Sequence, residues 1–197
     1  MSYLDTLNKR RSVYALTKDL TVPADDVVKL VEDVIVASPS AFNMQSARAV
    51  VLLGDEHKAL WDIVTNVLKQ HVPADQFTPT QDKMNMFAAG AGTIMFFDDD
   101  AVIDSYKQQF AKYASAFDMF AAHGLGIAQG NVWNALAELG IGANLQHYNP
   151  IIDADVKARW NLPESWRLVS QMVFGGVAAE PEPKDKLAAS ERVRVFR

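Results

Sequence analysis

Three short apolar runs, separated by stretches with helical periodicity, constrain the fold of this chain more than any other feature of its sequence. The runs cover residues 49–53, 93–97 and 168–174. Short apolar runs bounded by glycine or charged residues are typical of buried β-strands. Residues 141–145 are a weaker candidate for a fourth strand. Strands that alternate with helices predict a layered domain of the α/β or α+β class.

The segments around these strands carry apolar residues at the three- and four-residue spacing of helices. One helix opens at Asp25 and ends at Ser38, because a proline disfavours the helical conformation in the residue before it. Residues 73–81 contain two prolines and predict a surface loop. The helices expected from the spacing cover residues 3–10, 25–37, 55–69, 83–89, 101–112 and 116–139.

Length and composition exclude several classes of function. Of 197 residues 49% are hydrophobic, so we expect a single domain over residues 1–197 with a sizeable core. The net charge of −5 gives no reason to expect nucleic acid or an acidic membrane as a partner. Without cysteine, the chain has no disulfide, thiolate nucleophile or iron–sulfur ligand. No apolar stretch is typical of a signal peptide or a membrane span, so we expect a cytoplasmic protein.

Motifs of other enzyme classes are weak in this sequence. Residues 124–130 match G-x-G-x-x-x-G, but a dinucleotide fingerprint follows a strand, and the residues before these favour a helix. We therefore expect a helix with a small-residue face, packed inside the chain or against a second copy. The acids at 98–100 are expected to begin a helix rather than bind a metal. The four histidines lack metal-ligand spacing, and no G-x-S-x-G elbow occurs.

Three polar patches remain as candidates for a functional site. Arg10, Arg11 and Ser12 offer two guanidinium groups and a hydroxyl, which suit a phosphate or simply the solvated end of a helix. Residues 38–45 place small and amide side chains where they would contact the edge of a heterocycle or form a plain polar loop. Residues 140–150 are rich in glycine and amides, so the backbone could approach a ligand closely or merely turn.

Taken in this order, the patches resemble the nitroreductase family of flavoproteins. The motifs are R-x-S at residues 10–12, P-S-x-x-N-x-Q at 39–45 and G-I-G-A-N-L-Q-H-Y-N at 140–149. Arg192 and Arg194 lie where the family places basic residues for a flavin phosphate. Many members have an aromatic residue soon after the glutamine, whereas residues 46–48 read Ser-Ala-Arg here. The resemblance covers nearly the whole chain and leaves the shape of this wall of the pocket open.

The resemblance implies an α+β, nitroreductase-like fold, with a central, mostly antiparallel sheet flanked by helices, in an intertwined homodimer. It also implies two FMN sites at the dimer interface, each built from both chains. The phosphate of the FMN would be held by Arg10, Arg11, Ser12, Arg192 and Arg194. The flavin ring would be lined from the partner chain by Pro39, Ser40, Asn43 and Gln45. The ring would be flanked from the first chain by Asn144, Leu145, Gln146 and His147.

By the same resemblance, the chain would be an NAD(P)H-dependent oxidoreductase with a ping-pong mechanism. Its acceptors would be nitroaromatics, quinones or similar small electrophiles. A flavin supplies the hydride chemistry itself, so no catalytic base or nucleophile is needed from the protein. Two alternatives stay open, namely another flavin reaction on the same fold and a non-enzymatic protein that binds or stores flavin.

Overall fold

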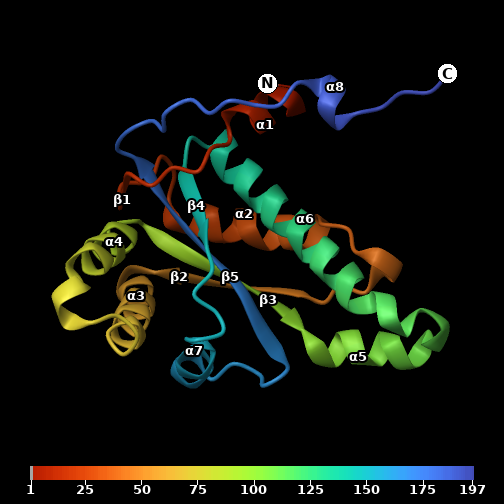
Figure 1. Cartoon of the computed structure of the whole chain (residues 1–197), viewed down its shortest axis with the longest axis horizontal. Helices are drawn as coiled ribbons and strands as arrows, with labels where there is room; N and C mark the ends of the chain where they lie inside the picture. The colour runs from red at the N-terminus through yellow and green to blue at the C-terminus, as the bar shows by residue number, and fades with distance from the viewer. Residues whose placement is uncertain (1) are drawn as a thin grey trace.

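A five-stranded antiparallel sheet with helices on both faces forms the body of the chain, as seen in a computed structural model that describes residues 2–197 (Figure 1). The strands are β1 (Leu16–Thr17), β2 (Ala47–Leu53), β3 (Gly92–Asp99), β4 (Gly142–Gln146) and β5 (Trp166–Val177). The helices are α1 (Tyr3–Lys9), α2 (Ala24–Ala37), α3 (Gly54–Leu68), α4 (Thr78–Ala88), α5 (Asp100–Gln109), α6 (Phe117–Glu138), α7 (Asp153–Trp160) and α8 (Ala189–Arg192). Three short 3-10 segments cover Ala41–Asn43, Ala74–Gln76 and Ala111–Ala116.

Strand β5 lies at the centre of the sheet. It pairs with β3 on one side and with β4 on the other, while β1 pairs with its C-terminal end and β2 pairs with β3. All of these pairings are antiparallel, which confirms the α+β class and the mostly antiparallel sheet. The four strands expected from the apolar runs are confirmed as β2, β3, β4 and β5.

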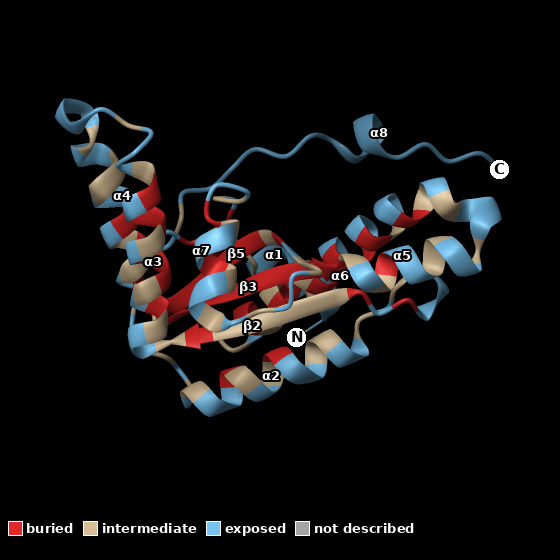
Figure 2. Cartoon of the chain, turned by 90° about the horizontal axis from the view of Figure 1, so that it is seen from below, coloured by how far each residue is buried: buried red, intermediate tan, exposed pale blue. Residues whose placement is uncertain are grey.

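Strand β3 is buried on both faces because its side chains alternate between two hydrophobic clusters. Ile94 and Phe96 pack with α2 and α6, whereas Met95 and Phe97 pack with α3, α4 and α7. A strand buried on both faces reads as a continuous apolar run, which is why the sequence pattern identified it. Figure 2 shows the buried residues concentrated along this strand, between the helical layers.

Helix boundaries differ from the expectation in a few places. Helix α4 begins at Thr78, inside the expected loop, because Pro79 sits in its first turn, where a missing N–H costs nothing. Helix α5 ends at Gln109 instead of residue 112, and a 3-10 segment follows. Helix α7 and strand β1 were not expected at all. Across residues 2–197, no helix combines the length and the hydropathy needed to cross a bilayer.

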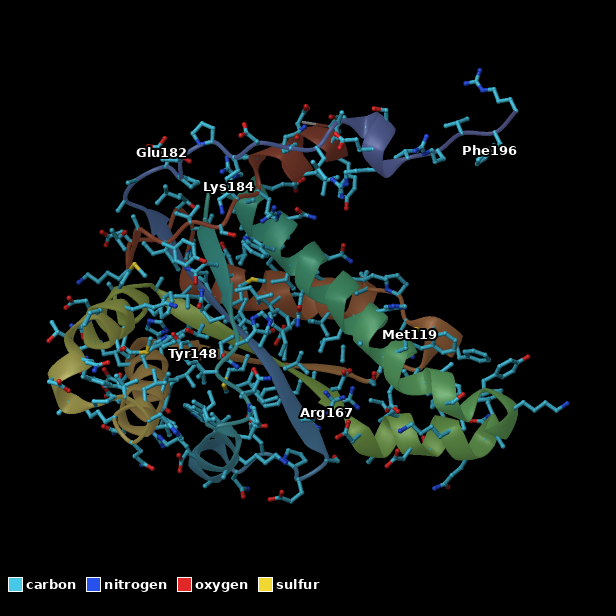
Figure 3. The ribbon with its side chains drawn as sticks, in the orientation of Figure 1. Met119, Tyr148, Arg167, Glu182, Lys184 and Phe196 are labelled. Carbon is cyan, nitrogen blue, oxygen red and sulfur yellow. The ribbon has the colours of Figure 1, made fainter. Side chains whose placement is uncertain are left out.

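Residues 178–197 form an extended C-terminal tail. The tail passes α1 and ends away from the sheet (Figure 1). Three hydrogen bonds tie its first part to the N-terminal region. The N–H of Ala178 donates to the carbonyl oxygen of Ala15 at 2.9 Å, Arg11 Nη2 donates to that of Glu182 at 2.6 Å, and Lys186 Nζ donates to Asn8 Oδ1 at 3.1 Å. The end of the tail is exposed, and Phe196 points away from the body with 93% of its surface accessible (Figure 3).

Candidate functional site

The fold joins the first and third polar patches in one chain. Ser12 forms a parallel bridge with Ala143, the second residue of β4, and the N–H of Val13 donates to the carbonyl oxygen of Ala143 at 2.9 Å. The side-chain amide of Asn144 donates to the carbonyl oxygen of Val13 at 2.9 Å. The segment that carries the two arginines is therefore fixed against β4.

A chain of buried amides holds the end of β4 in place. Gln146 Nε2 donates to Asn144 Oδ1 at 2.8 Å, and both side chains are buried. Gln171, on the neighbouring strand β5, accepts from the N–H of Tyr148 at 2.9 Å. Because these amides form hydrogen bonds with each other and with the backbone, they stabilise the strand. The side chains between and after them are more accessible, since Leu145 is half-buried and His147 is exposed.

Positive charge without an acidic counterpart gathers beside this strand. The guanidinium carbon of Arg10 lies 4.5 Å from the centroid of the Trp133 ring. Within residues 2–197, no carboxylate forms an ion pair with Arg10 or Arg11. Partial burial, with the charge of Arg11 added, lowers the pKa of Arg10 below its usual value. The buried Nε1 of Trp133 also has no acceptor among the described residues. Hydrogen-bond donors outnumber acceptors in this region, which would favour the binding of an anion.

An aromatic group continues this region toward α4, and sequence reasoning missed it. The ring of Phe87 lies 6.5 Å from Tyr14 and 6.5 Å from Tyr148, and Lys83 Nζ lies 5.7 Å from the same ring. Burial raises the pKa of Tyr148, labelled in Figure 3, to about 12. Lys83 thus adds a cation to the aromatic group of Tyr14, Phe87 and Tyr148. No sequence signal could have found it, because only tertiary packing brings α4 here.

The second polar patch, residues 38–45, lies elsewhere on the chain. Its first residue, Ser38, accepts a hydrogen bond from Asn131 Nδ2 of α6 at 3.0 Å, and residues 39–45 form a loop. It packs on the N-terminal half of α6, where a Cβ added to Gly124 would lie 3.4 Å from Ser40 Cβ. Pro39, Ser40 and Gln45 line a cavity of about 300 Å³ between this helix and the ends of α2 and β2. The loop therefore lies within van der Waals reach of α6 at Gly124.

The backbone of this loop is strained. Three of its non-glycine residues have positive φ angles, which are 55° at Phe42, 53° at Asn43 and 53° at Gln45. Such a conformation costs about 1–3 kcal/mol per residue, and it persists only where the surroundings enforce it. One enforcing contact is the N–H of Gln45, which donates to Ser40 Oγ at 2.9 Å. Strain of this kind is concentrated at functional sites, so the loop is a candidate site element.

The two parts of the candidate site do not meet within one chain. Gly124 contacts the loop and Trp133 contacts Arg10, and nine residues of α6 separate the two positions, or about 14 Å along the helix axis. Arg192 and Arg194 lie in the exposed tail, and no side-chain hydrogen bond or ion pair joins them to another residue within 2–197. The structure thus unites Ser12 with β4 and leaves the loop and the tail arginines apart.

The other motifs have structural roles. The G-x-G-x-x-x-G motif lies inside α6, which confirms the helix and excludes a phosphate-binding turn there. Asp99 caps α5 by accepting from the N–H of Ala101 at 3.2 Å, which confirms that the acidic run begins a helix. Asp98 and Asp100 form ion pairs with Arg167 of β5, which is labelled in Figure 3.

Comparison with known proteins identifies the family. Residues 7–176 match the nitroreductase family. This chain is a member of that family. The matched range includes the segment that carries Arg10, the strained loop and β4, and it ends before the tail.

Relatives of this nitroreductase-family chain cover 93% of it or more. It is 42% identical over 185 residues to the candidate nitroreductase HBN1 of Saccharomyces cerevisiae, with 93% of this chain and 92% of HBN1 covered. It is also 42% identical to the nitroreductase CinD of Lactococcus lactis, solved in complex with nicotinic acid, with all of both chains covered and a TM-score of 0.93. CinD has also been solved with chloramphenicol and with 4-nitrophenol. These findings confirm the predicted family and fold, and they make the chain an oxidoreductase.

A more distant structure shares the fold. A nitroreductase-like protein from Desulfovibrio desulfuricans, solved in complex with FMN, is 17% identical and gives a TM-score of 0.72, with 100% of this chain and 98% of that chain covered. At this identity the comparison supports the fold alone. The predicted intertwined dimer and the predicted roles of individual residues stay predictions.

Proposed function

We propose that this chain is an FMN-dependent NAD(P)H oxidoreductase that reduces nitroaromatics, quinones or similar acceptors. The observation that carries the proposal is the pair Arg10 and Arg11, which adjoins β4 in a nitroreductase fold and has no acidic partner in the described chain. Family membership supports the oxidoreductase class, and the unpaired arginines support a phosphate-bearing cofactor. The whole of residues 1–197 would form one FMN-binding domain.

The donor set suits FMN. A phosphate monoester carries about −1.5 to −2 charges near neutral pH, and guanidinium groups bind it with paired, charge-assisted hydrogen bonds. Arg10, stacked on Trp133, has its donors free of carboxylates, and Ser12 adds a hydroxyl beside β4. Lys83 is a further cation, next to Phe87 and its neighbours Tyr14 and Tyr148. FMN ends in such a phosphate, whereas the chain shows no fingerprint for the adenine half of FAD.

Strand β4 and the strained loop would hold the flavin ring from two sides. The amide chain of Asn144 and Gln146 would fix the backbone of β4, so that Leu145 and His147 lie beside the ring. Pro39, Ser40, Asn43 and Gln45 would contact the ring from a second copy of the chain. The 14 Å along α6 between the two parts supports this division, because one chain does not bring them together.

We propose a homodimer for the same reason. The tail leaves Leu187, Val193, Val195 and Phe196 between 60% and 93% exposed, which is the apolar surface that a second copy would cover. A tail that lies on the partner would also bring Arg192 and Arg194 toward a phosphate. We further propose a cytoplasmic location, because NAD(P)H, the proposed electron donor, is supplied there.

Bound FMN would supply the hydride transfer from NAD(P)H to the acceptor. The chain itself would have to bind the FMN, orient it and exclude water from the site. The only dinucleotide-like motif is part of helix α6, so the nicotinamide would dock over the flavin rather than in a domain of its own. Donor and acceptor would then use the same space in turn, which gives a ping-pong mechanism. CinD has been solved with nicotinic acid, chloramphenicol and 4-nitrophenol, each of which contains an aromatic ring, and this supports aromatic ligands for the present chain.

The test begins with the purified protein. We expect a yellow protein whose cofactor, released by heat, runs as FMN on chromatography; FAD as the main species would contradict the cofactor assignment. Anaerobic NADH or NADPH should bleach the colour, and a quinone should restore it. If neither nucleotide bleaches a flavin-loaded protein, the chain is a flavin-binding or storage protein. If bleaching occurs but no quinone or nitroaromatic restores the colour, it catalyses a different flavin reaction.

A further inference from the structure

Arg48, the second residue of β2, ties the strained loop to the body of the protein. Its Nη1 donates to the carbonyl oxygen of Gln45 at 2.7 Å and to that of Ala47 at 3.0 Å. Its Nη2 forms an ion pair with Asp99 Oδ2 at 3.0 Å. The guanidinium also lies 5.9 Å from the ring centroid of Trp166. One side chain therefore connects the last residue of the loop to the end of β3.

The far end of this connection is rigid. Asp99 accepts from the N–H of Ala101 and thereby caps α5, and its own N–H donates to the carbonyl oxygen of Ser46 at 2.9 Å. Ser46 is buried and its hydroxyl lies 3.3 Å from Asp98 Oδ1. The anchor is thus part of a buried strand end and a helix start, both of which are fixed by several hydrogen bonds.

The loop needs such an anchor at this position. Gln45 has a φ of 53°, a conformation that a glutamine leaves when nothing holds it. The amide of Gln45 is held by Ser40 Oγ and its carbonyl by Arg48, so both sides of the strained residue are bound. The carbonyl bond is charge-assisted and therefore the stronger kind of contact.

We propose that Arg48 is a positioning residue, which holds Gln45 and the loop before it in the conformation that receives the flavin. This inference rests on the proposed function, because the loop is assigned to the flavin there. Three of the five N–H donors of Arg48 are taken by Gln45, Ala47 and Asp99, so the role assigned to it is to hold the loop rather than to bind the cofactor. It acts through the shape of the loop.

A matched control lies on β5, on the other side of β3 from β2. Arg167 also pairs with acids at the end of β3, with Nη2 3.4 Å from Asp98 Oδ2 and Nε 3.1 Å from Asp100 Oδ1, but it makes no hydrogen bond to the loop. Arg167→Ala removes the same charge from the same end of β3. Any effect shared by the two variants reflects charge or general stability, and an effect specific to Arg48→Ala reflects the loop.

The first measurement is hydrogen exchange in the flavin-free protein. In Arg48→Ala we expect the amide of Gln45 to exchange about tenfold faster or more, as its hydrogen bond to Ser40 Oγ opens with the loop. Arg167→Ala should leave this amide within about twofold of the native rate. Equal protection in Arg48→Ala and the native protein would overturn the proposal, and this holds whether or not the chain binds FMN.

The second measurement is FMN affinity, followed by quenching of flavin fluorescence. Arg48→Ala should weaken binding about tenfold to hundredfold, and Arg48→Lys should restore part of the loss, because lysine keeps the charge without the planar fork. Glycine adopts a positive φ without strain, so in a Gln45→Gly background the same Arg48→Ala change should cost less than about threefold.

The outcomes separate the two hypotheses. A native protein without FMN affinity overturns the proposed function, while the exchange measurement still decides whether Arg48 fixes the loop. A native protein that binds FMN, with Arg48→Ala binding equally well, overturns the positioning role alone. Equal losses in Arg48→Ala and Arg167→Ala, or an undiminished loss in the Gln45→Gly background, would also overturn it.

Discussion

Arg10 allows the proposed phosphate site to be tested by a single substitution. We expect Arg10→Ala to weaken FMN binding by about 1.5–3 kcal/mol, which is roughly tenfold to hundredfold in affinity and is the range for a hydrogen bond to a charged group. The guanidinium lies against Trp133 and forms no ion pair within residues 2–197, so a bound phosphate would be its charged partner.

The same substitution should leave the fold nearly unchanged. Burial and the neighbouring Arg11 lower the pKa of Arg10, which means that the folded, ligand-free protein disfavours this charge. Removing it loses a cation–π contact with Trp133, worth about 0.5–1 kcal/mol at exposed sites, but it also relieves the repulsion between the two arginines. We therefore expect the free energy of unfolding of the flavin-free protein to change by less than about 1 kcal/mol.

The assay compares three variants by fluorescence titration of flavin-free protein with FMN. Arg10→Lys keeps the charge and loses the planar fork, so its affinity should lie between native and Arg10→Ala. Arg159→Ala removes the same charge from α7, where Arg159 pairs with Glu56 at 2.8 Å, and should bind FMN normally. If Arg10→Ala binds FMN as the native protein does, the arginine is the solvated end of a helix and the phosphate lies elsewhere.

Three further predictions concern pH, assembly and kinetics. His57 is buried against Thr93, and burial lowers its pKa to about 4, so as the pH falls the unfolded state takes up a proton before the folded state does. The free energy of unfolding should therefore fall by about 3 kcal/mol as the pH drops from 6.5 to about 4. Urea titrations should show this fall in the native protein and not in His57→Gln. Light scattering at micromolar concentration should give about twice the chain mass of 21.8 kDa, and a stable, flavin-loaded monomer would contradict the dimer. Initial rates at several concentrations of NAD(P)H and quinone should give parallel double-reciprocal lines, whereas intersecting lines would show a ternary complex.

Much of the sheet could be predicted because the burial of its strands requires apolar runs that are visible in the local sequence. Strand β3 has a continuous apolar run at residues 94–97 since both of its faces are covered, and β5 has another at residues 172–174. Helix α7 escaped prediction because only Val156 of its residues is fully buried, so it has little apolar periodicity. Strand β1 has two residues, too few for any pattern, and exists because β5 extends beyond β4 to pair with it.

The candidate site was predictable in its parts and not in its assembly. Glycine, amide and arginine residues mark the segments that carry Arg10, Gln45 and Asn144, but their distances depend on tertiary packing. The bridge between Ser12 and Ala143 brings two of the segments together, and nothing local to either segment encodes that pairing. The contacts of Arg48 could not be predicted either, because its partner Asp99 is distant in sequence and comes close to it only through the pairing of β2 with β3.

The length of α6 between the two parts of the site has a consequence for how the protein responds to its own concentration. If each flavin pocket is completed by a second chain, the fraction of pockets that hold flavin depends on the concentration of the protein as well as on that of the flavin. Dilution of the protein should then release the cofactor and separate the two chains together. Linkage is reciprocal, so saturating flavin should tighten the dimer; a ligand at about one hundred times its Kd stabilises the state that binds it by about 2.7 kcal/mol. Flavin supply would then set how much of the chain is assembled, and with it how much of the apolar tail around Phe196 stays exposed.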